Sequence, residues 1–156
     1  MRVGLVIYGS LDTISGGYLY DRKLVEQLDV LGHSVSVVTL AYRDYAKHLV
    51  DNFDTTWNRR LATAPVDLML QDELNHPSLL WANFRRRGKN RRYPVAAVVH
   101  HLRSSETEHS SLLHRLYREI ERIYLNSVDA LLYNSETTRY TVEPLLKRRP
   151  PALVAY

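Results

Sequence analysis

The chain has 156 residues, close to the length of one ordinary domain and long enough to bury a hydrophobic core. Hydrophobic residues make up 45% and charged residues 24%, which argues against a disordered, collagen-like or coiled-coil protein. The absence of cysteine excludes disulfides, thiolate metal sites, iron–sulfur clusters and cysteine nucleophiles, and the net charge of +4 favours anionic partners.

The first part of the chain predicts a strand, a helix and a second strand. Residues 2–8, RVGLVIY, form an apolar run typical of a strand that is buried on both faces. After a loop, residues 18–32 carry leucines at helical spacing and end at a glycine. Residues 35–40, VSVVTL, indicate a second buried strand. This order is typical of a right-handed parallel unit.

The remaining segments alternate in the same way, after a loosely helical stretch over residues 41–64. We expect further strands over residues 66–71, 94–100, 128–134 and 152–156. We expect further helices over residues 77–87, 111–127 and 136–146. The second of these should bury a side formed by Leu113, Leu116, Ile120, Ile123 and Tyr124. The pattern predicts one three-layer α/β, Rossmann-like domain with a mostly parallel sheet over residues 1–156.

Ligands of such sheets bind beyond the carboxyl ends of the strands, so the loops after the predicted strands hold the candidate site. The first loop ends in Ser15-Gly16-Gly17 at the start of a helix. Backbone amides and the helix dipole favour an anion there, and glycines permit a close approach, so Gly16 and Gly17 form a candidate phosphate site. Turn geometry is the alternative explanation of the two glycines.

The tract HHLRSSETEH, residues 100–109, follows a predicted strand and combines imidazoles with Arg103 and Glu106. A histidine there can donate to an anion or act as a base near neutral pH. The alternative is that the histidines are ordered by backbone contacts. We expect no metal site, because His100 and His101 point in opposite directions if the strand continues.

Two further strand ends carry polar residues. Asn134, Ser135, Glu136 and Arg139 open the helix after the fifth strand, where they either meet an anion or cap the helix. Residues 71–76, QDELNH, place carboxylates after the third strand. These carboxylates could accept sugar hydroxyls, but a surface role facing water is the favoured interpretation.

The segment FRRRGKNRRYP concentrates the positive charge of the chain in Arg85, Arg86, Arg87, Lys89, Arg91 and Arg92. A solvated loop is the first interpretation, and an anionic membrane surface is the second. We expect no nucleic-acid partner, because the sequence has neither a recognition helix nor a ribonucleoprotein aromatic motif. The apolar run at the N-terminus is too short for a signal peptide or a membrane span. The expectation is a cytoplasmic protein that can lie at the inner membrane face.

The order of these motifs resembles that of retaining glycosyltransferases of family 4, which have the GT-B architecture. The loop ending in GGYLYDRKLVEQL and the following LGHSVSVVTL are similar to the family's Gly-Gly, helix and GHxVxVVT opening. VAAVVHHL is similar to its strand ending in His, and VDALLYNSETTRYTVEPLL to a later segment. The likeness spans nearly the whole chain.

The resemblance implies that this chain is the N-terminal, acceptor-side half of such an enzyme. A C-terminal donor-binding domain would follow in cis, and the N-terminal domain alone would be inactive. The implied donor is a UDP- or GDP-sugar, the acceptor is a sugar, a lipid or another small molecule, and no metal is needed. The donor's own phosphate would assist the acceptor hydroxyl, while protein groups stabilise the charge of the leaving group.

Carried onto this sequence, the resemblance implies that His100 contacts the sugar or phosphates near the reacting centre. Gly16 and Gly17 would approach the donor diphosphate or the acceptor. The implied acceptor-side residues are Tyr18, His101, Arg103, Glu106, Asn134, Ser135, Glu136 and Arg139. The alternative function is a stand-alone module without catalysis, which binds a nucleotide or anion or docks on a membrane surface.

Overall fold

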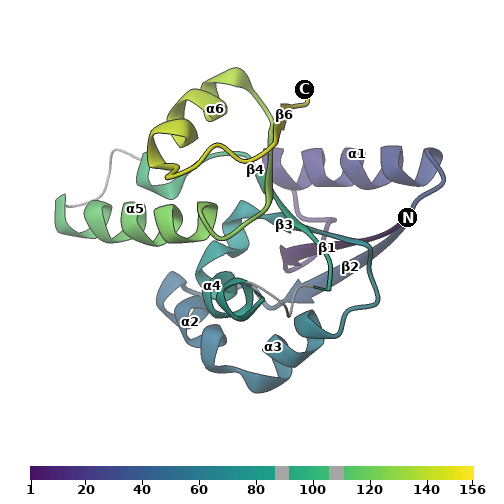
Figure 1. Cartoon of the computed structure of the whole chain (residues 1–156), viewed down its shortest axis with the longest axis horizontal. Helices are drawn as coiled ribbons and strands as arrows, with labels where there is room; N and C mark the ends of the chain where they lie inside the picture. The colour runs from purple at the N-terminus through teal and green to yellow at the C-terminus, as the bar shows by residue number, and fades with distance from the viewer. Residues whose placement is uncertain (87–91, 106–110) are drawn as a thin grey trace.

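The computed structural model describes residues 1–86, 92–105 and 111–156. Within these ranges six parallel strands form one sheet in the order β2-β1-β3-β4-β5-β6 (Figure 1). The strands are β1 (Arg2–Tyr8), β2 (Ser34–Leu40), β3 (Leu68–Asp72), β4 (Val95–Val99), β5 (Ala130–Tyr133) and β6 (Ala152–Val154). The chain moves from β1 to one side and then crosses to β3 on the other. The topological switch point therefore lies between β1 and β3.

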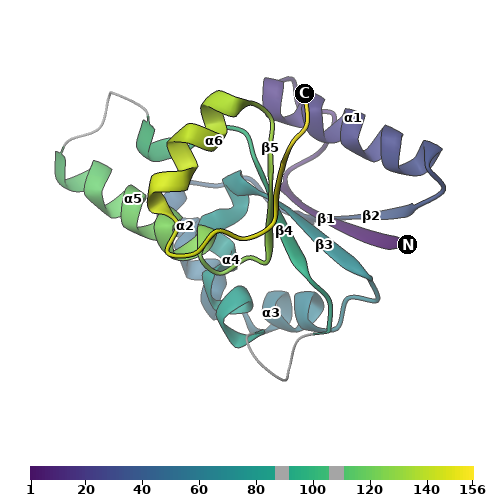
Figure 2. The same cartoon turned by 45° about the horizontal axis from the view of Figure 1, so that its top comes forward.

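Helices cover both faces of the sheet, as the turned view shows (Figure 2). They are α1 (Gly16–Val30), α2 (Tyr45–Val50), α3 (Thr55–Ala62), α4 (His76–Arg85), α5 (Ser111–Leu125) and α6 (Glu136–Val142). Alternate residues of β1 face opposite layers: Leu5 packs in the cluster that contains Tyr18 of α1, whereas Val6 packs in the cluster that contains Trp57 of α3. The predicted three-layer, Rossmann-like α/β domain is confirmed.

The boundaries of α1 follow from local chemistry. Ser15 adopts an extended conformation, and its side chain accepts a hydrogen bond from the backbone N–H of Tyr18. The helix therefore begins two residues earlier than predicted, at Gly16. After the helix, Gly32 has a φ of +77°, a left-handed conformation that glycine adopts without steric cost. These caps fix the direction in which α1 crosses the sheet.

Three sequence-based expectations about packing are wrong. β2 is an edge strand with exposed and half-buried residues, because a neighbouring strand covers only one of its sides. On α5 the prediction holds for Ile120 and Tyr124, which are buried, but Leu113, Leu116 and Ile123 are exposed. Tyr117 is buried in addition, so the buried face is rotated from the predicted one. α6 ends at Val142, and a short 3-10 turn over Glu143–Leu145 replaces the last predicted helical turn.

In the described residues, no helix combines the length and the apolar character needed to cross a lipid bilayer.

Candidate functional site

His100 lies at the carboxyl end of β4, against the first turns of α1. Its Nε2 atom is 3.2 Å from Oδ1 of Asp21 on that helix. A Cβ atom placed on Gly17 would lie 3.3 Å from Cδ2 of the imidazole, so the ring occupies the space beside this glycine. Tyr20 meets the ring edge-on, with the two ring centroids 5.0 Å apart. Contacts from one helix thus fix the imidazole in place.

The two glycines of the predicted phosphate site have different surroundings. A Cβ atom on Gly16 would find nothing within 4 Å, so the first turn of α1 is open at this position. Gly17 is explained by the close approach of the His100 ring, which a larger side chain would crowd. A phosphate contact at Gly16 stays a prediction. The contact between Gly17 and His100 could not be predicted, because the two residues lie far apart in the sequence.

Two buried carboxyl groups accompany the imidazole. Asp21 on α1 and Asp72 at the end of β3 are both fully buried. One oxygen, Oδ2, of each carboxyl group has no hydrogen-bond partner among the described residues. Burial disfavours two like charges side by side, and this opposes ionisation of Asp72.

The charges of this group set its protonation. Burial raises the pKa of Asp72, and the neighbouring charge of Asp21 raises it further. Burial alone would lower the pKa of His100, but the hydrogen bond to Asp21 and the charges of Asp72 and Asp21 outweigh this effect and raise it. These shifts favour a protonated imidazole. Because Nε2 faces Asp21, the buried Nδ1, which has no hydrogen-bond partner among the described residues, is the N–H group left to donate to an anion.

Within the part of the chain that the structure describes, these three side chains form the group whose metal-ligating atoms lie close together. Single donor atoms of Asp21, Asp72 and His100 all lie within 4.8 Å of one another. Three such donors could hold a metal ion. The raised pKa values of Asp72 and His100 favour protons on these two groups instead. The expectation of no metal therefore stays a prediction that an experiment can check.

The favoured interpretation that residues 71–76 face water is wrong. Five members of this segment are buried: Gln71, Asp72, Glu73, Asn75 and His76. The carboxyl group of Glu73 is buried because it has backbone partners. Its Oε2 accepts hydrogen bonds from the backbone N–H groups of His100 at 2.8 Å and His101 at 3.3 Å. Burial, followed by the charge of Asp72, raises the pKa of Glu73 well above its ordinary value. The side chain ties the end of β3 to the end of β4.

The start of α6 also reaches the strand end that carries His100. Ser135 caps this helix, accepting a hydrogen bond from the N–H of Thr138 at 3.1 Å. The Thr138 hydroxyl in turn lies 3.1 Å from the backbone oxygen of His100 and 2.7 Å from Oδ1 of Asn134. The capping interpretation of Ser135 is confirmed. Through Thr138, Asn134 and Ser135 are linked to the backbone of His100 rather than to its imidazole.

The charged residues of α6 are paired with each other. Nε of Arg139 is 2.8 Å from a carboxylate oxygen of Glu143, and its guanidinium is 3.6 Å from Glu136. These groups are largely exposed, so the ion pairs contribute little to stability. Their role toward an acceptor stays a prediction.

The other predicted acceptor-side residues take structural or surface positions. Tyr18 is buried, and its hydroxyl donates to the backbone oxygen of Tyr8 at 2.7 Å. His101 is exposed. The guanidinium of Arg103 lies over the rings of Tyr45 and Tyr117, at 5.3 and 5.0 Å. Glu106 lies outside the described residues.

A second buried polar cluster has the residue types of a hydrolase triad but not the connectivity. Oδ2 of Asp51 is 2.7 Å from the hydroxyl of Ser78 and 3.2 Å from Nδ1 of His48. Nε2 of the same histidine accepts from the backbone N–H of Arg43. The aspartate therefore stands between serine and histidine, where the imidazole cannot take the serine proton. The Ser78 hydroxyl is also 2.6 Å from Tyr8, so the cluster joins α4 to β1.

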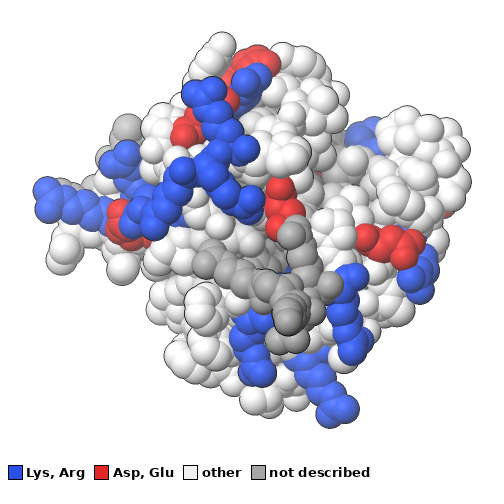
Figure 3. All heavy atoms as spheres, viewed as in Figure 1, with Lys and Arg blue, Asp and Glu red and all other residues white. Residues whose placement is uncertain are grey.

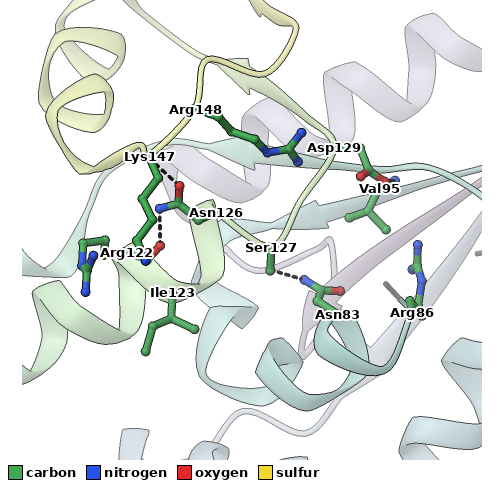
Figure 4. Close-up of a pocket in the computed structure, with 10 residues that line it drawn as sticks. All are labelled: Asn83, Arg86, Val95, Arg122, Ile123, Asn126, Ser127, Asp129, Lys147 and Arg148. Carbon is green, nitrogen blue, oxygen red and sulfur yellow. Dashed lines mark hydrogen bonds between the residues drawn. The ribbon is translucent and has the colours of Figure 1, made fainter. Parts of the chain in front are cut away.

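One hollow of the surface lies at the opposite edge of the sheet, at the amino ends of β4 and β5 (Figure 4). Its volume is about 550 Å³. Asn126 in its wall donates to the backbone oxygen of Leu145 at 3.0 Å and accepts from the backbone N–H of Lys147 at 2.7 Å. Arg148 donates to the backbone oxygen of Val128. These bonds satisfy the end of α5 and the following loops, which explains the polar lining without a ligand.

The carboxyl edge remains the better candidate for function, because the switch point, the first turn of α1 and the buried titratable groups meet there. A scan of protein-family models finds no match to this chain, and a search of curated proteins finds none either. Fold and site together define a Rossmann-like domain with an imidazole held by buried carboxyl groups at the carboxyl edge of its sheet.

Proposed function

We propose that this chain is the N-terminal, acceptor-side domain of a retaining glycosyltransferase that uses a nucleotide sugar. One observation carries the proposal: the imidazole of His100, with its raised pKa, lies at a strand end beside the first turns of α1. That is where the resemblance to family 4 glycosyltransferases expects the histidine that meets the sugar or the phosphates. The Rossmann-like fold supports the same proposal.

In this role His100 is a donor to developing negative charge. The leaving diphosphate of a UDP- or GDP-sugar gains charge as the glycosidic bond breaks, and a fixed imidazolium lowers the energy of that state. Asp21 and Asp72 keep the proton on the ring. A sugar, lipid or other small-molecule acceptor would approach near Asn134 and Ser135. The donor half would be supplied in cis by a C-terminal domain, so the chain alone would not transfer sugar.

The test uses the protein at its full natural length beside the 156-residue chain. Release of UDP or GDP from a panel of nucleotide sugars is measured with sugar, lipid and small-molecule acceptors. We expect turnover by the full-length protein, and a loss of about 100-fold or more for His100→Gln. His33→Gln is the matched control, because His33 lies beyond the far end of α1, and it should retain turnover.

The outcome separates this proposal from a stand-alone binding module. Full turnover by the His100→Gln protein would remove the histidine from the reacting centre. A full-length protein that consumes no nucleotide sugar would overturn the glycosyltransferase proposal. Nucleotide binding by the 156-residue chain without any transfer would then favour the binding module, for which the open first turn at Gly16 is the candidate contact.

A further inference from the structure

A second hollow lies between α3 and α4, away from the candidate site. Its volume is about 710 Å³. Four of the described residues that line it are arginines: Arg59, Arg85, Arg86 and Arg92. No Asp or Glu is among the described lining residues. Figure 3 shows Lys and Arg side chains over the region of α3 and α4. Positive charge is therefore concentrated around this hollow.

Three of these arginines have no acidic partner among the described residues. Arg59, Arg85 and Arg92 are exposed and form no ion pair with any residue that the structure describes. Arg139 differs, since it is paired with carboxylates of its own helix. Like charges that gather without counter-charges repel one another, and an anionic partner relieves this repulsion.

Exposed aromatic rings flank the same hollow. The exposed fractions are 83% for Phe53, 45% for Trp81 and 57% for Phe84. Trp81 and Phe84 stack on each other, with ring centroids 5.6 Å apart. The other tryptophan, Trp57, is only 3% exposed and donates its indole N–H to the backbone oxygen of Ser78. Large exposed aromatic rings beside cations are typical of a surface that binds a membrane or another molecule.

We propose that this aromatic-basic face, formed by Phe53, Arg59, Trp81, Arg85 and Arg92, docks on a membrane surface rich in anionic phospholipids. Aromatic rings settle at the headgroup level of a bilayer, while arginines beside them bind lipid phosphates. Single-stranded nucleic acid fits less well, because it needs ring faces free for the bases, and Trp81 already stacks on Phe84. The other residues of the predicted basic run, Arg87, Lys89 and Arg91, lie outside the described residues.

The experiment is co-sedimentation of the 156-residue chain with two kinds of vesicle, phosphatidylcholine alone and phosphatidylcholine mixed with phosphatidylglycerol. We expect binding to the anionic vesicles only, weakening as salt is added. Replacing Arg59, Arg85 and Arg92 together by Gln should lower the vesicle partition coefficient about 100-fold, which corresponds to about 1 kcal/mol for each cation. The matched control replaces Arg115, Arg118 and Arg149, which are also exposed but lie outside the hollow.

Tryptophan fluorescence gives an independent measure of the same event. Because Trp57 is buried, a blue shift on adding anionic vesicles reports Trp81. Phe53→Ser should weaken binding to the anionic vesicles by the same factor at low and at high salt, because the contribution that it removes is apolar.

Equal binding to both vesicles, or equal losses for the two triple variants, would overturn the proposal. Two further arms test other partners. Binding of a single-stranded oligonucleotide in place of vesicles would assign the face to nucleic acid, and release from vesicles by inorganic phosphate alone would assign the hollow to a soluble anion. None of these results depends on glycosyl transfer.

Discussion

The imidazole of His100 and the carboxyl group of Asp21 meet at 3.2 Å although 79 residues separate them in the chain. The helix α1 and the end of β4 bring them together at the carboxyl edge of the sheet. The contact gives the histidine a counter-charge in a place where burial alone would strip its proton. The raised pKa favours the charged form of the imidazole, which is the form that suits an anionic ligand.

Asp21→Asn should lower the pKa of His100. The amide keeps the shape of the side chain but removes the charge that favours the imidazolium, so burial becomes the dominant effect. NMR titration of the histidine side chains measures this directly. Asp12→Asn, on an exposed loop, removes the same charge and should leave the pKa of His100 unchanged. An unaltered titration of His100 in the Asp21→Asn protein would show that the pair does not control the proton.

Stability should fall as the pH rises through about 7, the pKa to which burial and the charge of Asp21 raise Asp72, and further through the raised pKa of His100. His100 and Asp72 both have raised pKa values in the folded state, so the folded chain binds more protons than the unfolded chain. The stabilising effect of His100 is complete below its unfolded pKa and is lost as the pH rises through its folded pKa. The carboxylate of Asp72 becomes costly above its unfolded pKa, and the full cost is reached above its folded pKa.

Asp72→Asn separates the two contributions to this pH dependence. The amide is neutral at every pH, so the melting temperature of this variant should fall less steeply with rising pH than that of the unchanged chain. Differential scanning calorimetry at several pH values measures the slopes. Identical slopes would mean that burial does not raise the pKa of Asp72.

The sequence predicted the architecture well because the strands are short, apolar and regularly spaced. The run VAAVVHH placed His100 at a strand end, which is where it lies. The same reasoning failed for the segment QDELNH. Its polar letters suggested water, but Glu73 is buried because it satisfies two backbone N–H groups of the neighbouring strand end.

The partnership of His100 with Asp21 could not be predicted either. Asp21 lies within a helix among Arg22 and Lys23, and nothing in its local sequence says that this one carboxyl group faces the sheet. Contacts between segments far apart in the chain depend on strand order and helix direction. The hydrophobic pattern of the sequence predicts where helices and strands lie, but not which of them become neighbours in space.

Added metal should leave the fold unchanged. Asp21, Asp72 and His100 could ligate an ion, but the raised pKa values of Asp72 and His100 favour protons that a metal ion would have to displace. We expect the melting temperature to be the same with EDTA, Mg²⁺ or Mn²⁺. A rise that grows with metal concentration and disappears in Asp72→Asn would show that the group is a metal site.

Glu73→Ala should destabilise the fold by about 1–3 kcal/mol, because it removes the acceptor of two backbone N–H groups in a buried place. Chemical denaturation measures the change. Glu136→Ala is the control, since this half-exposed carboxylate forms only a 3.6 Å ion pair with Arg139, and its loss should cost no more than about 1 kcal/mol. Equal costs for the two variants would refute the tie between β3 and β4.

The two neighbouring glycines of α1 should respond differently to alanine. At Gly16 the new methyl group enters open space, so the gain in helix propensity should stabilise the chain by about 0.4–1 kcal/mol. At Gly17 the same gain is opposed, because the methyl group would lie 3.3 Å from the ring of His100, which Asp21 and Tyr20 hold in place. Gly17→Ala should therefore be less stable than Gly16→Ala and should shift the NMR signals of His100. Equal stabilities and an unshifted imidazole would mean that the ring moves away without cost and that α1 does not fix its position.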